Sequence, residues 1–370
     1  MRIKFEKKEF LKAVKVGGSF ANSQKVLPIL GCIKVTIKSD KCWIMSYDNR
    51  NAIKTLCNFL ESDGDGVFCI NKSDIFDYVS SIDEDVFEID VDNSTLTAVI
   101  MTSRGTMEYC VENANEYPVL NIGGDSTTFE MDSSLLGYWI QRGSCILVND
   151  DMQLNHQNMH MIIKDGKVDV FFFNFNKMYH DVSDIDFDGE YRMSIDRNSF
   201  IGLKYAIESS ERVKIKDSKL NTMIVGGDTM VMIRKDDFNM LDYPRLLAYK
   251  PIFEVKVDKQ KLESVLMRAS NVCRSSLEGT LHITYGNGII TFTANDFETR
   301  KKFHEVLETE GGELEQEFTQ CYTINLFKMI LGTIKSDKVL ICPTGERTLL
   351  IFKNTEYDTE NAFLSPCAKS

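Results

Sequence analysis

The residues of this sequence best suited to chemistry are cations spaced along expected helices. Lys8, Lys12 and Lys15 fall at positions i, i+4 and i+7 of the first helix, opposite its apolar stripe. Cations seven residues apart recur later, as Arg197 with Lys204, Lys261 with Arg268, and Lys328 with Lys335. One such stripe is usually a solvated face. Recurrence in a chain of net charge −12 instead favours a surface for a polyanion, because the composition gives no other reason for it.

Motifs for catalysis are missing from the sequence. It has no GxxxxGK[ST] or GxGxxG phosphate loop and no GxSxG nucleophile elbow. His156 and His160 stand four residues apart, but His160 lies in a strand-like run with no nearby glutamate, which argues against a zinc pair. The ten cysteines form no CxxC pair and are expected to be reduced and mostly buried. The sequence therefore predicts a binding protein rather than an enzyme, with no metal and no cofactor.

The elements that carry these cations are repeated three times, about 120 residues apart. Each copy opens with a strand and a helix, beginning at Phe5, Phe129 and Phe253. A second helix follows roughly seventy residues into each copy, and the first two copies close with Glu-Tyr-Pro and Asp-Tyr-Pro. A repeat this long is a whole domain, since stacked solenoid repeats have periods of roughly 20 to 50 residues. We predict an α+β fold of three similar domains, at residues 1–122, 127–247 and 252–370, each with two helices packed on antiparallel sheets.

The chain is expected to be soluble and cytoplasmic, without a membrane partner. It contains no run of 18 or more apolar residues. Residues 1–6 lead directly into an alternating strand instead of an apolar signal core.

Two segments carry a resemblance to a known family. Residues 26–31, Val-Leu-Pro-Ile-Leu-Gly, resemble the Leu-Pro-Ile-Leu segment that follows the first helix in the bacterial DNA polymerase III β subunits, the DNA sliding clamps. Residues 242–246, Asp-Tyr-Pro-Arg-Leu, are similar to that family's Pro-Asp-Tyr-Arg-Arg-Val stretch. The resemblance spans the whole chain in length, repeat, spacing and acidity. It implies the DNA clamp fold, with a head-to-tail homodimer whose six domains form a ring around duplex DNA. Such a ring, associated with the nucleoid, would tether the replicative polymerase after a clamp loader places it.

The resemblance also implies roles for particular residues. The candidates for the DNA channel, which would contact phosphates and not bases, are Lys12, Lys15, Gln24, Lys25, Arg142, Arg197, Lys204, Lys261, Arg268 and Lys328. The candidates for an apolar groove that binds partner peptides are Met178, Tyr179, Arg245, Leu246, Leu349, Leu364, Pro366 and Cys367. The candidates for the subunit contact are Met107, Tyr109 and Val272. The family's Thr-Asp-Gly-His-Arg-Leu is replaced here by residues 174–179, Asn-Phe-Asn-Lys-Met-Tyr, so the peptide preference of the groove is expected to differ.

Two other readings of the sequence remain open. One is an acidic α+β enzyme that acts on nucleic acid through carboxylates such as Asp83, Glu84 and Asp85, although these fit a polar turn better. The other is a clamp-like scaffold that no longer loads on DNA. Loss of the stripes formed by Lys12, Lys15 and Arg268 would favour the scaffold, and those stripes are present.

Overall fold

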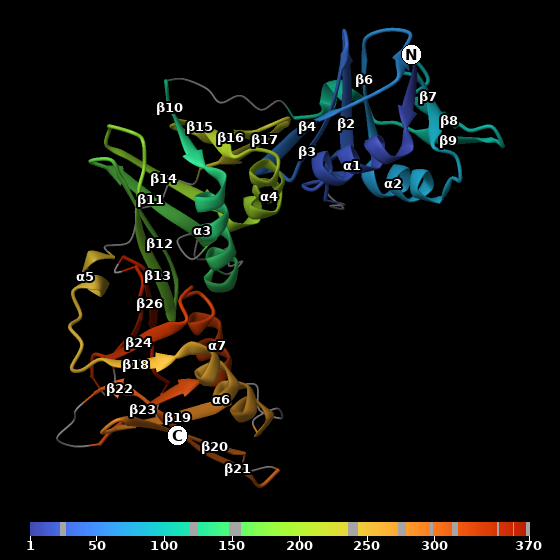
Figure 1. Cartoon of the computed structure of the whole chain (residues 1–370). Coiled ribbons are helices and arrows are strands. Elements are labelled where there is room, and N and C mark those ends of the chain that lie inside the picture. The colour runs from blue at the N-terminus through green and yellow to red at the C-terminus, as the bar shows by residue number, and fades with distance from the viewer. Residues whose placement is uncertain are drawn as a thin grey trace. The chain divides into compact units, whose positions relative to one another are not determined.

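The computed structural model describes the chain in ten segments (Figure 1). These are residues 1–22, 27–118, 125–147, 157–235, 243–272, 279–296, 299–312, 317–345, 348–357 and 359–367. Contacts between residues divide the chain into two compact units. Unit 1 comprises Met1–Gly137 and Asn198–Asp236, and unit 2 comprises Tyr138–Arg197 and Asp237–Ser370.

Unit 1 is built on two antiparallel sheets. The smaller has the strand order β5-β1-β7-β8-β9 and the larger the order β10-β15-β16-β17-β4-β3-β2-β6. Their strands are β1 (Arg2–Glu6), β2 (Cys32–Lys38), β3 (Lys41–Tyr47), β4 (Asn51–Cys57), β5 (Glu61–Ser62), β6 (Gly66–Asn71), β7 (Val86–Asp92), β8 (Thr97–Met101), β9 (Thr106–Cys110), β10 (Ser126–Asp132), β15 (Arg212–Ser218), β16 (Asn221–Gly226) and β17 (Thr229–Arg234). Residues alternate along them, and Ile33, Val35 and Ile37 of β2 bury one face.

Two helices of unit 1 cover the same face of the larger sheet. They are α1 (Lys7–Gly17) and α4 (Phe200–Glu208). A Cβ at Gly17 would lie 2.6 Å from the carbonyl oxygen of Ile44 in β3, and a Cβ at Gly226 in β16 would lie 2.1 Å from that of Ala206 in α4. Helix and sheet therefore approach closely only because these residues are glycines. Helix α2 (Lys72–Ser81) packs beside α1 and begins where the Asn71 side chain accepts hydrogen bonds from two backbone N–H groups.

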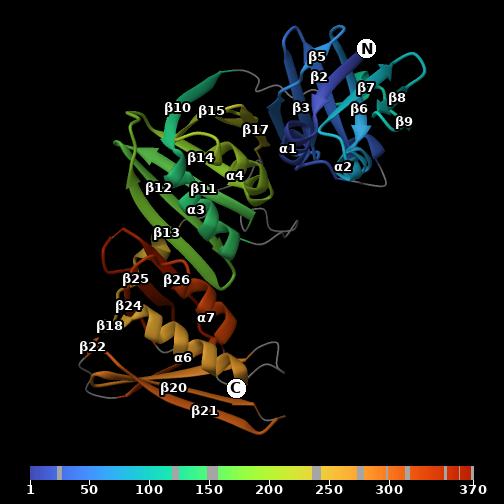
Figure 2. The same ribbon diagram turned by 45° about the vertical axis from the view of Figure 1, so that its right-hand side comes forward.

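Unit 2 also has two antiparallel sheets, of order β14-β11-β12-β13-β26-β25-β24-β18-β22 and β21-β20-β19-β23. The strands are β11 (Asn158–Lys164), β12 (Lys167–Asn174), β13 (Lys177–Asp184), β14 (Tyr191–Asp196), β18 (Val255–Asp258), β19 (Thr280–Gly286), β20 (Ile289–Asp296), β21 (Lys301–Glu308), β22 (Glu310–Gly311), β23 (Phe318–Thr323), β24 (Lys338–Pro343), β25 (Leu350–Asn354) and β26 (Asn361–Leu364). Its helices include α5 (Pro244–Leu247), α6 (Lys259–Val272) and α7 (Ile324–Leu331), and α6 and α7 lie side by side (Figure 2). Helix α3 (Ser133–Ile146) starts in unit 1 and continues in unit 2.

The predicted repeat is visible in the order of the elements. A strand leads directly into a helix at β1–α1, β10–α3 and β18–α6, and again at β6–α2, β14–α4 and β23–α7, with a 3₁₀ turn, Arg197–Ser199, before α4. The α+β class is confirmed, with mixed helices and antiparallel sheets. The contacts form two units because sheets continue across the predicted domain boundaries, where β4 pairs with β17 and β13 pairs with β26. The boundaries at 122, 127, 247 and 252 stay predictions.

Candidate nucleic-acid and peptide interfaces

The helical face of unit 1 presents the first group of predicted cations. Lys12 and Lys15 on α1 and Lys204 on α4 are all exposed. Lys12 lines a cavity of about 400 Å³ at the seam between these two helices, with Glu9, Glu208 and Asp228 among the other lining residues. The seam is therefore mixed in charge, and Lys15 and Lys204 lie outside that cavity lining.

The adjacent helices α6 and α7 present a second group of cations in unit 2. Lys261 and Arg268 of α6 and Lys328 of α7 are exposed, and the Lys328 Nζ lies 3.5 Å from the Ser270 hydroxyl. Arg268 donates two hydrogen bonds to the Glu305 carboxylate of β21, one of them at 2.9 Å. That pairing lowers the pKa of Glu305. The charge of Arg268 is thus partly compensated within the protein, whereas Lys261 has no ion pair among the described residues.

The remaining channel candidates differ from the expected arrangement. Arg197 is half-buried in the 3₁₀ turn before α4 instead of on the helix, and it belongs to unit 2 while Lys204 belongs to unit 1. Lys335 lies beyond the end of α7 at Leu331, so its pairing with Lys328 is not a helical stripe. Gln24 and Lys25 lie outside the described residues.

Arg142 is buried, and the prediction that it contacts DNA is wrong for this fold. The residue is 4% exposed, and its Nε lies 3.2 Å from the Glu360 carboxylate. Its guanidinium also stacks on the Tyr138 ring, 3.2 Å from the ring centroid. Glu360 accepts further hydrogen bonds from the hydroxyls of Tyr138 and Tyr179 and from Asn354. A guanidinium satisfied in this buried network cannot reach a phosphate without breaking it, because unpairing a buried charge costs several kcal/mol.

The same network holds the Glu360 carboxylate in its charged form. Burial alone would raise the pKa of Glu360, but hydrogen bonds from Tyr138, Asn354 and Tyr179 and the charge of Arg142 together lower it. Burial and the hydrogen bond to this carboxylate raise the pKa of the Tyr138 hydroxyl above its usual range. The network therefore contains an ionised carboxylate, a guanidinium and neutral tyrosines, and its role is to connect α3 with the segment before β26.

The other face of the nine-stranded sheet in unit 2 carries an apolar cluster. Its buried members are Phe171, Phe173, Met178, Tyr243, Cys342, Ile351 and Phe363, and the partly buried Ile162, Leu247, Leu340 and Leu349 pack against it. The Tyr243 ring stacks on Phe171 with centroids 3.9 Å apart, and its hydroxyl donates to Asp169 at 2.6 Å. Two of the predicted groove residues, Met178 and Leu349, come together here.

Other predicted groove residues lie elsewhere. Tyr179 follows Met178 in β13 and so points to the opposite face, where it is fully buried and bonded to Glu360. Leu364 is also fully buried, opposite Lys177 in β13 and Leu350 in β25, which makes it a strand residue of the sheet. The placement of Tyr179 and Leu364 in the groove is therefore wrong.

The segment after β26 and helix α5 contribute the rest of the predicted groove. Pro366 and Cys367 are half-buried, and the Cys367 N–H donates to the Cys321 carbonyl at 2.9 Å. Arg245 is exposed, and the Leu246 side chain lies outside the described part of the structure. The sequence reasoning missed Phe171, Phe173 and Phe363. The alternation of Phe171 and Phe173 within a strand was the signal that could have found the first two.

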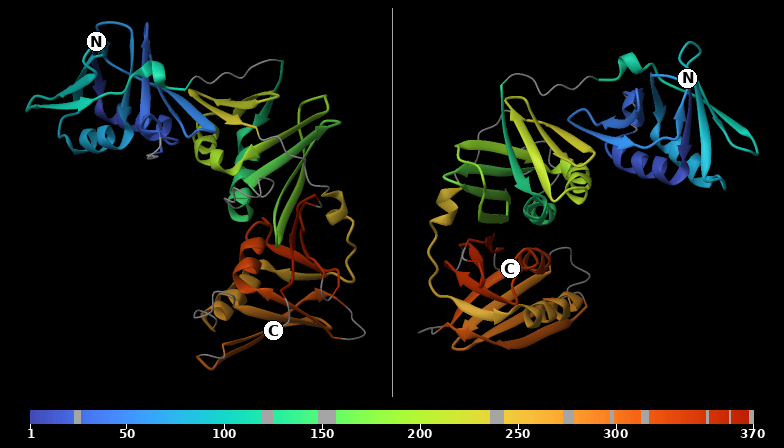
Figure 3. Two further views of the ribbon diagram at one scale, coloured as in Figure 1. Left: turned by 180° about the vertical axis from the view of Figure 1, so that it is seen from behind. Right: turned by 45° about the horizontal axis from the view of Figure 1, so that its top comes forward.

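The predicted subunit-contact residues lie at an edge strand and at a helix end. Met107 and Tyr109 are on β9, which ends its sheet and forms a hairpin with β8 (Figure 3). Met107 is 41% exposed, and Tyr109 packs its ring against Tyr78. Val272 is half-buried at the last position of α6 in unit 2. Strand β21 is likewise an edge strand, at one end of the four-stranded sheet of unit 2.

The carboxylates of the alternative enzyme reading are used in surface contacts. Asp83 pairs with Arg104 at 2.8 Å, and Glu84 accepts a hydrogen bond from Ser103 at 2.6 Å. Asp85 is exposed in the turn before β7. Within the described segments, no three His, Cys, Asp or Glu residues are grouped so as to hold a metal ion. In those same segments, no helix is both long and apolar enough to cross a membrane.

Comparison with known proteins assigns a class to this fold. The chain matches solved β subunits of DNA polymerase III over the whole length of both chains: that of Pseudomonas aeruginosa with a TM-score of 0.90 at 16% identity, and that of Thermotoga maritima with 0.90 at 13% identity. A putative DNA polymerase III β subunit of Eubacterium rectale gives a TM-score of 0.91 at 13% identity, again over all of both chains. The fold is thus that of the DNA polymerase III β subunits.

Sequence comparison agrees with the fold. Residues 1–121 match the family model of the DNA polymerase III beta subunit, N-terminal domain. The curated "Beta sliding clamp" of Pseudomonas aeruginosa is 19% identical over 343 residues, covering 92% of each chain. That of Pseudomonas putida is 18% identical over 371 residues, covering 99% of each. The predicted resemblance to the β-subunit family is confirmed.

Proposed function

We propose that this chain is a DNA sliding clamp, a ring-shaped processivity factor that encircles duplex DNA and tethers a replicative polymerase. The observation that carries the proposal is the charge of the helical faces. A chain of net charge −12 exposes Lys12, Lys15 and Lys204 on the helices of unit 1, and Lys261, Arg268 and Lys328 on those of unit 2. Rows of cations on helices, on a fold shared with β subunits, suit loose contacts to phosphates that do not read sequence.

The ring would be a head-to-tail homodimer of a three-domain chain, with domains at 1–122, 127–247 and 252–370. Two exposed edge strands support this arrangement, β9 in unit 1 and β21 in unit 2. An unpaired strand edge is a template for pairing with another chain. Pairing β9 of one copy with β21 of the other would cover Met107, which is 41% exposed, and Val306, which is 47% exposed. Val272 at the end of α6 would lie in the same contact.

The clamp would act by proximity and not by chemistry. Holding a polymerase on the DNA it copies raises the effective concentration of the primer end, and this requires no catalytic group in the clamp. The partners would be the polymerase and a clamp loader, in the cytoplasm at the nucleoid. Their peptides would bind over the apolar cluster of unit 2, beside Met178, Leu349, Arg245 and the segment containing Pro366 and Cys367.

The test combines mass with topology and needs no loader. Light scattering should give about 85 kDa, twice the 42.3 kDa of one chain. The protein is then threaded at high concentration onto linear duplex DNA, and both ends are blocked with biotin–streptavidin. Protein retained after a high-salt wash should be released when a restriction enzyme cuts the DNA. Equal retention on DNA with open ends and on DNA with blocked ends would mean that the protein binds DNA without encircling it. A dimer that is never retained on end-blocked DNA would contradict the clamp proposal.

Matched variants connect retention with the helical cations. The triple variant Lys12→Glu, Lys15→Glu and Lys204→Glu should lose retention at lower salt while its mass stays dimeric, since each lost phosphate contact weakens binding. A control with the same change in charge replaces lysines in hairpins of the same unit, Lys38, Lys41 and Lys219, which are all exposed. Equal losses in the two triple variants would assign the effect to net charge and remove Lys12, Lys15 and Lys204 from the DNA channel.

A further inference from the structure

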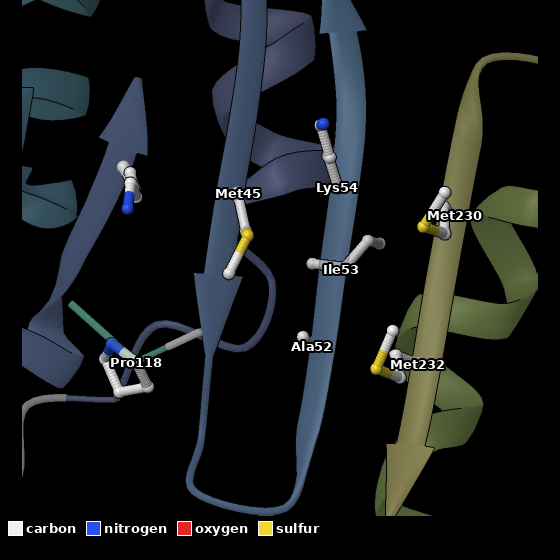
Figure 4. A pocket seen from close by; sticks show the side chains of 8 residues that line it. Met45, Ala52, Ile53, Lys54, Pro118, Met230 and Met232 are labelled. Carbon is white, nitrogen blue, oxygen red and sulfur yellow. The ribbon is translucent and has the colours of Figure 1, made fainter. Parts of the chain in front are cut away.

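A cavity lies on the face of the eight-stranded sheet that α1 and α4 do not cover. It has a volume of about 250 Å³ and lies wholly within unit 1. The labelled side chains around it come from β3, β4 and β17 and from the segment that contains Pro118 (Figure 4). The residues that line it are Lys34, Met45, Ala52, Ile53, Lys54, Pro118, Met230 and Met232.

Strand register explains why the lining side chains that come from strands, apart from Ile53, share a face. Residues directly opposite one another in neighbouring antiparallel strands lie on the same side of a sheet. One such row runs across four strands and contains Lys34, Met45, Lys54 and Met230. The next row contains Tyr47, Ala52, Met232 and Met223. Three thioethers therefore surround the cavity and a fourth, that of Met223, flanks it. Methionine side chains are flexible and polarisable, which suits surfaces that accept varied apolar partners.

The fold builds this surface twice. In unit 1, one row crosses β3, β4, β17 and β16 with the residues Tyr47, Ala52, Met232 and Met223. In unit 2, the matching row crosses β12, β13, β26 and β25 with the residues Phe173, Met178, Phe363 and Ile351. A tyrosine from a Tyr-Pro pair packs over each row, Tyr243 in unit 2 and Tyr117 in unit 1. The apolar cluster of unit 2 and the methionine cavity of unit 1 are thus the same construction, made once where the first copy of the repeat pairs with the second and once where the second pairs with the third.

The cavity of unit 1 differs from the cluster of unit 2 in its charge. The Lys54 Nζ lies 4.5 Å from the centroid of the Trp43 ring, and burial lowers the pKa of Lys54. The Lys34 Nζ donates to the Ala114 carbonyl at 3.3 Å and lies 5.6 Å from the Tyr117 ring centroid. Within the part of the chain that the structure describes, neither lysine forms an ion pair, and no carboxylate lines the cavity. Two ammonium groups beside an apolar cavity complement a partner that carries both apolar and acidic side chains.

We propose that this cavity is a second docking site, which binds a short acidic and apolar segment of a partner protein through Met45, Met230 and Met232 and through Lys34 and Lys54. The site is separate from the DNA-facing helices, which cover the opposite face of the same sheet. It is also separate from the peptide site proposed in unit 2. The inference goes beyond the clamp role and does not depend on it, since it requires neither DNA nor a ring.

Methyl NMR of the full-length chain tests the proposal directly. The protein is labelled with ¹³C at its methionine methyl groups, and the signals of Met45, Met230 and Met232 are assigned by single Met→Leu substitutions. The probe is an acetylated synthetic peptide, Asp-Leu-Asp-Leu-Phe, and the matched control is Lys-Leu-Lys-Leu-Phe. The acidic peptide should shift the signals of the three cavity methionines, and Met267, which is 64% exposed on α6 in unit 2, should not move.

Charge variants separate the cavity from nonspecific attraction. Lys34→Glu with Lys54→Glu should weaken binding of the acidic peptide about tenfold or more, which corresponds to about 1.4 kcal/mol. Lys34→Arg with Lys54→Arg should bind as the parent does, and so should Lys38→Glu with Lys41→Glu on the nearby hairpin. Any of four results would overturn the proposal: no shift of the cavity methionines at millimolar peptide, shifts confined to Met178 in unit 2, equal binding of the basic peptide, or shifts that depend only on protein concentration. The last would mean that a second copy of the chain covers the cavity. DNA retention is measured separately, so this failure is distinct from failure of the clamp role.

Discussion

Replacing Glu360 with alanine should destabilise unit 2 strongly. The carboxylate receives hydrogen bonds from Tyr138, Tyr179 and Asn354 and pairs with Arg142 at 3.2 Å. Without it, the guanidinium of Arg142, which is 4% exposed, keeps among the described residues only the Tyr138 ring and carbonyl within bonding distance. Removing one partner of a buried ion pair costs roughly 3–5 kcal/mol. We take about 4 kcal/mol as the expected loss, because hydrogen bonds within one network are not additive.

The two tryptophans of the chain allow the effect to be assigned to unit 2. Trp43 lies in unit 1 and Trp139 lies in unit 2, where its Nε1 donates to Asp181 at 2.8 Å. In a Trp43→Phe background, urea unfolding followed by fluorescence therefore reports on the surroundings of Trp139. The Glu360→Ala variant should unfold at a lower urea concentration than the parent. In a thermal scan its melting temperature should fall by about 10 °C, at roughly 2–4 °C per kcal/mol for a unit of this size.

A double variant tests whether the unpaired charge of Arg142 causes the loss of stability. Replacing both partners, as Arg142→Met with Glu360→Leu, should restore most of the stability, since no unpaired charge remains buried. If Glu360→Ala alone costs less than about 1 kcal/mol, the network does not stabilise unit 2 and the argument fails. The double variant should also be retained on end-blocked DNA as the parent is. A loss of retention at full stability would return Arg142 to the DNA channel.

Three further perturbations have defined outcomes. The pKa of Glu360 is lowered on folding, so its contribution to stability is complete above the unfolded value of about 4.3 and is lost as pH falls through the folded value. The difference in unfolding free energy between the parent and Glu360→Gln should therefore shrink from pH 6 to pH 3. A difference that grows would mean that folding raises the pKa of Glu360. Met107→Asp puts a charge on the β9 edge and should give a 42.3 kDa monomer by light scattering, whereas a persistent dimer would remove β9 from the contact. Deleting residues 366–370 should weaken binding of a polymerase peptide and leave the unfolding of unit 2 unchanged. A deletion that starts at Leu364 should unfold unit 2, because Leu364 pairs with both β13 and β25. Unchanged peptide binding after the shorter deletion would contradict the peptide site proposed in unit 2.

The repeat and the α+β class could be predicted from the sequence because both depend on local patterns. Strand alternation and helix periodicity are properties of short windows, and they located the openings at Phe5, Phe129 and Phe253. Exposure of Lys12 and Lys15 followed from the same helical spacing. What local patterns do not contain is the pairing of strands from different copies, such as β4 with β17. That pairing makes sheets continuous and gathers the contacts into two units.

The errors in the predicted site have one physical cause. Neighbouring residues of a strand point to opposite faces of the sheet. When a whole segment is placed in the groove because it matches a family motif, every second side chain is therefore placed on the wrong face. Met178 lies in the apolar cluster, and Tyr179 beside it lies in the buried network of Glu360. The prediction that Arg142 lies in the DNA channel failed for a related reason, because a cation on a helix can face the core when a buried carboxylate pairs with it. The partner, Glu360, is 218 residues away and is not visible in any local window.

Opposite faces of one sheet would let this chain combine an acidic composition with the two proposed binding surfaces. In unit 1, the face with Ile44 and Ile53 packs against α1 and α4, which carry Lys12, Lys15 and Lys204 on their outer sides. Residues one position along the same strands form the methionine cavity on the other face. A substitution such as Lys54→Glu can therefore alter peptide docking without touching the helical cations, and Lys15→Glu can do the reverse. The helical cations and the residues proposed to dock a peptide are different side chains, although Ile53 of the helix-covered face also lines the cavity. The two proposed activities should therefore respond independently to mutation, and coupling between them would have to arise from Ile53 or from the backbone of the sheet itself.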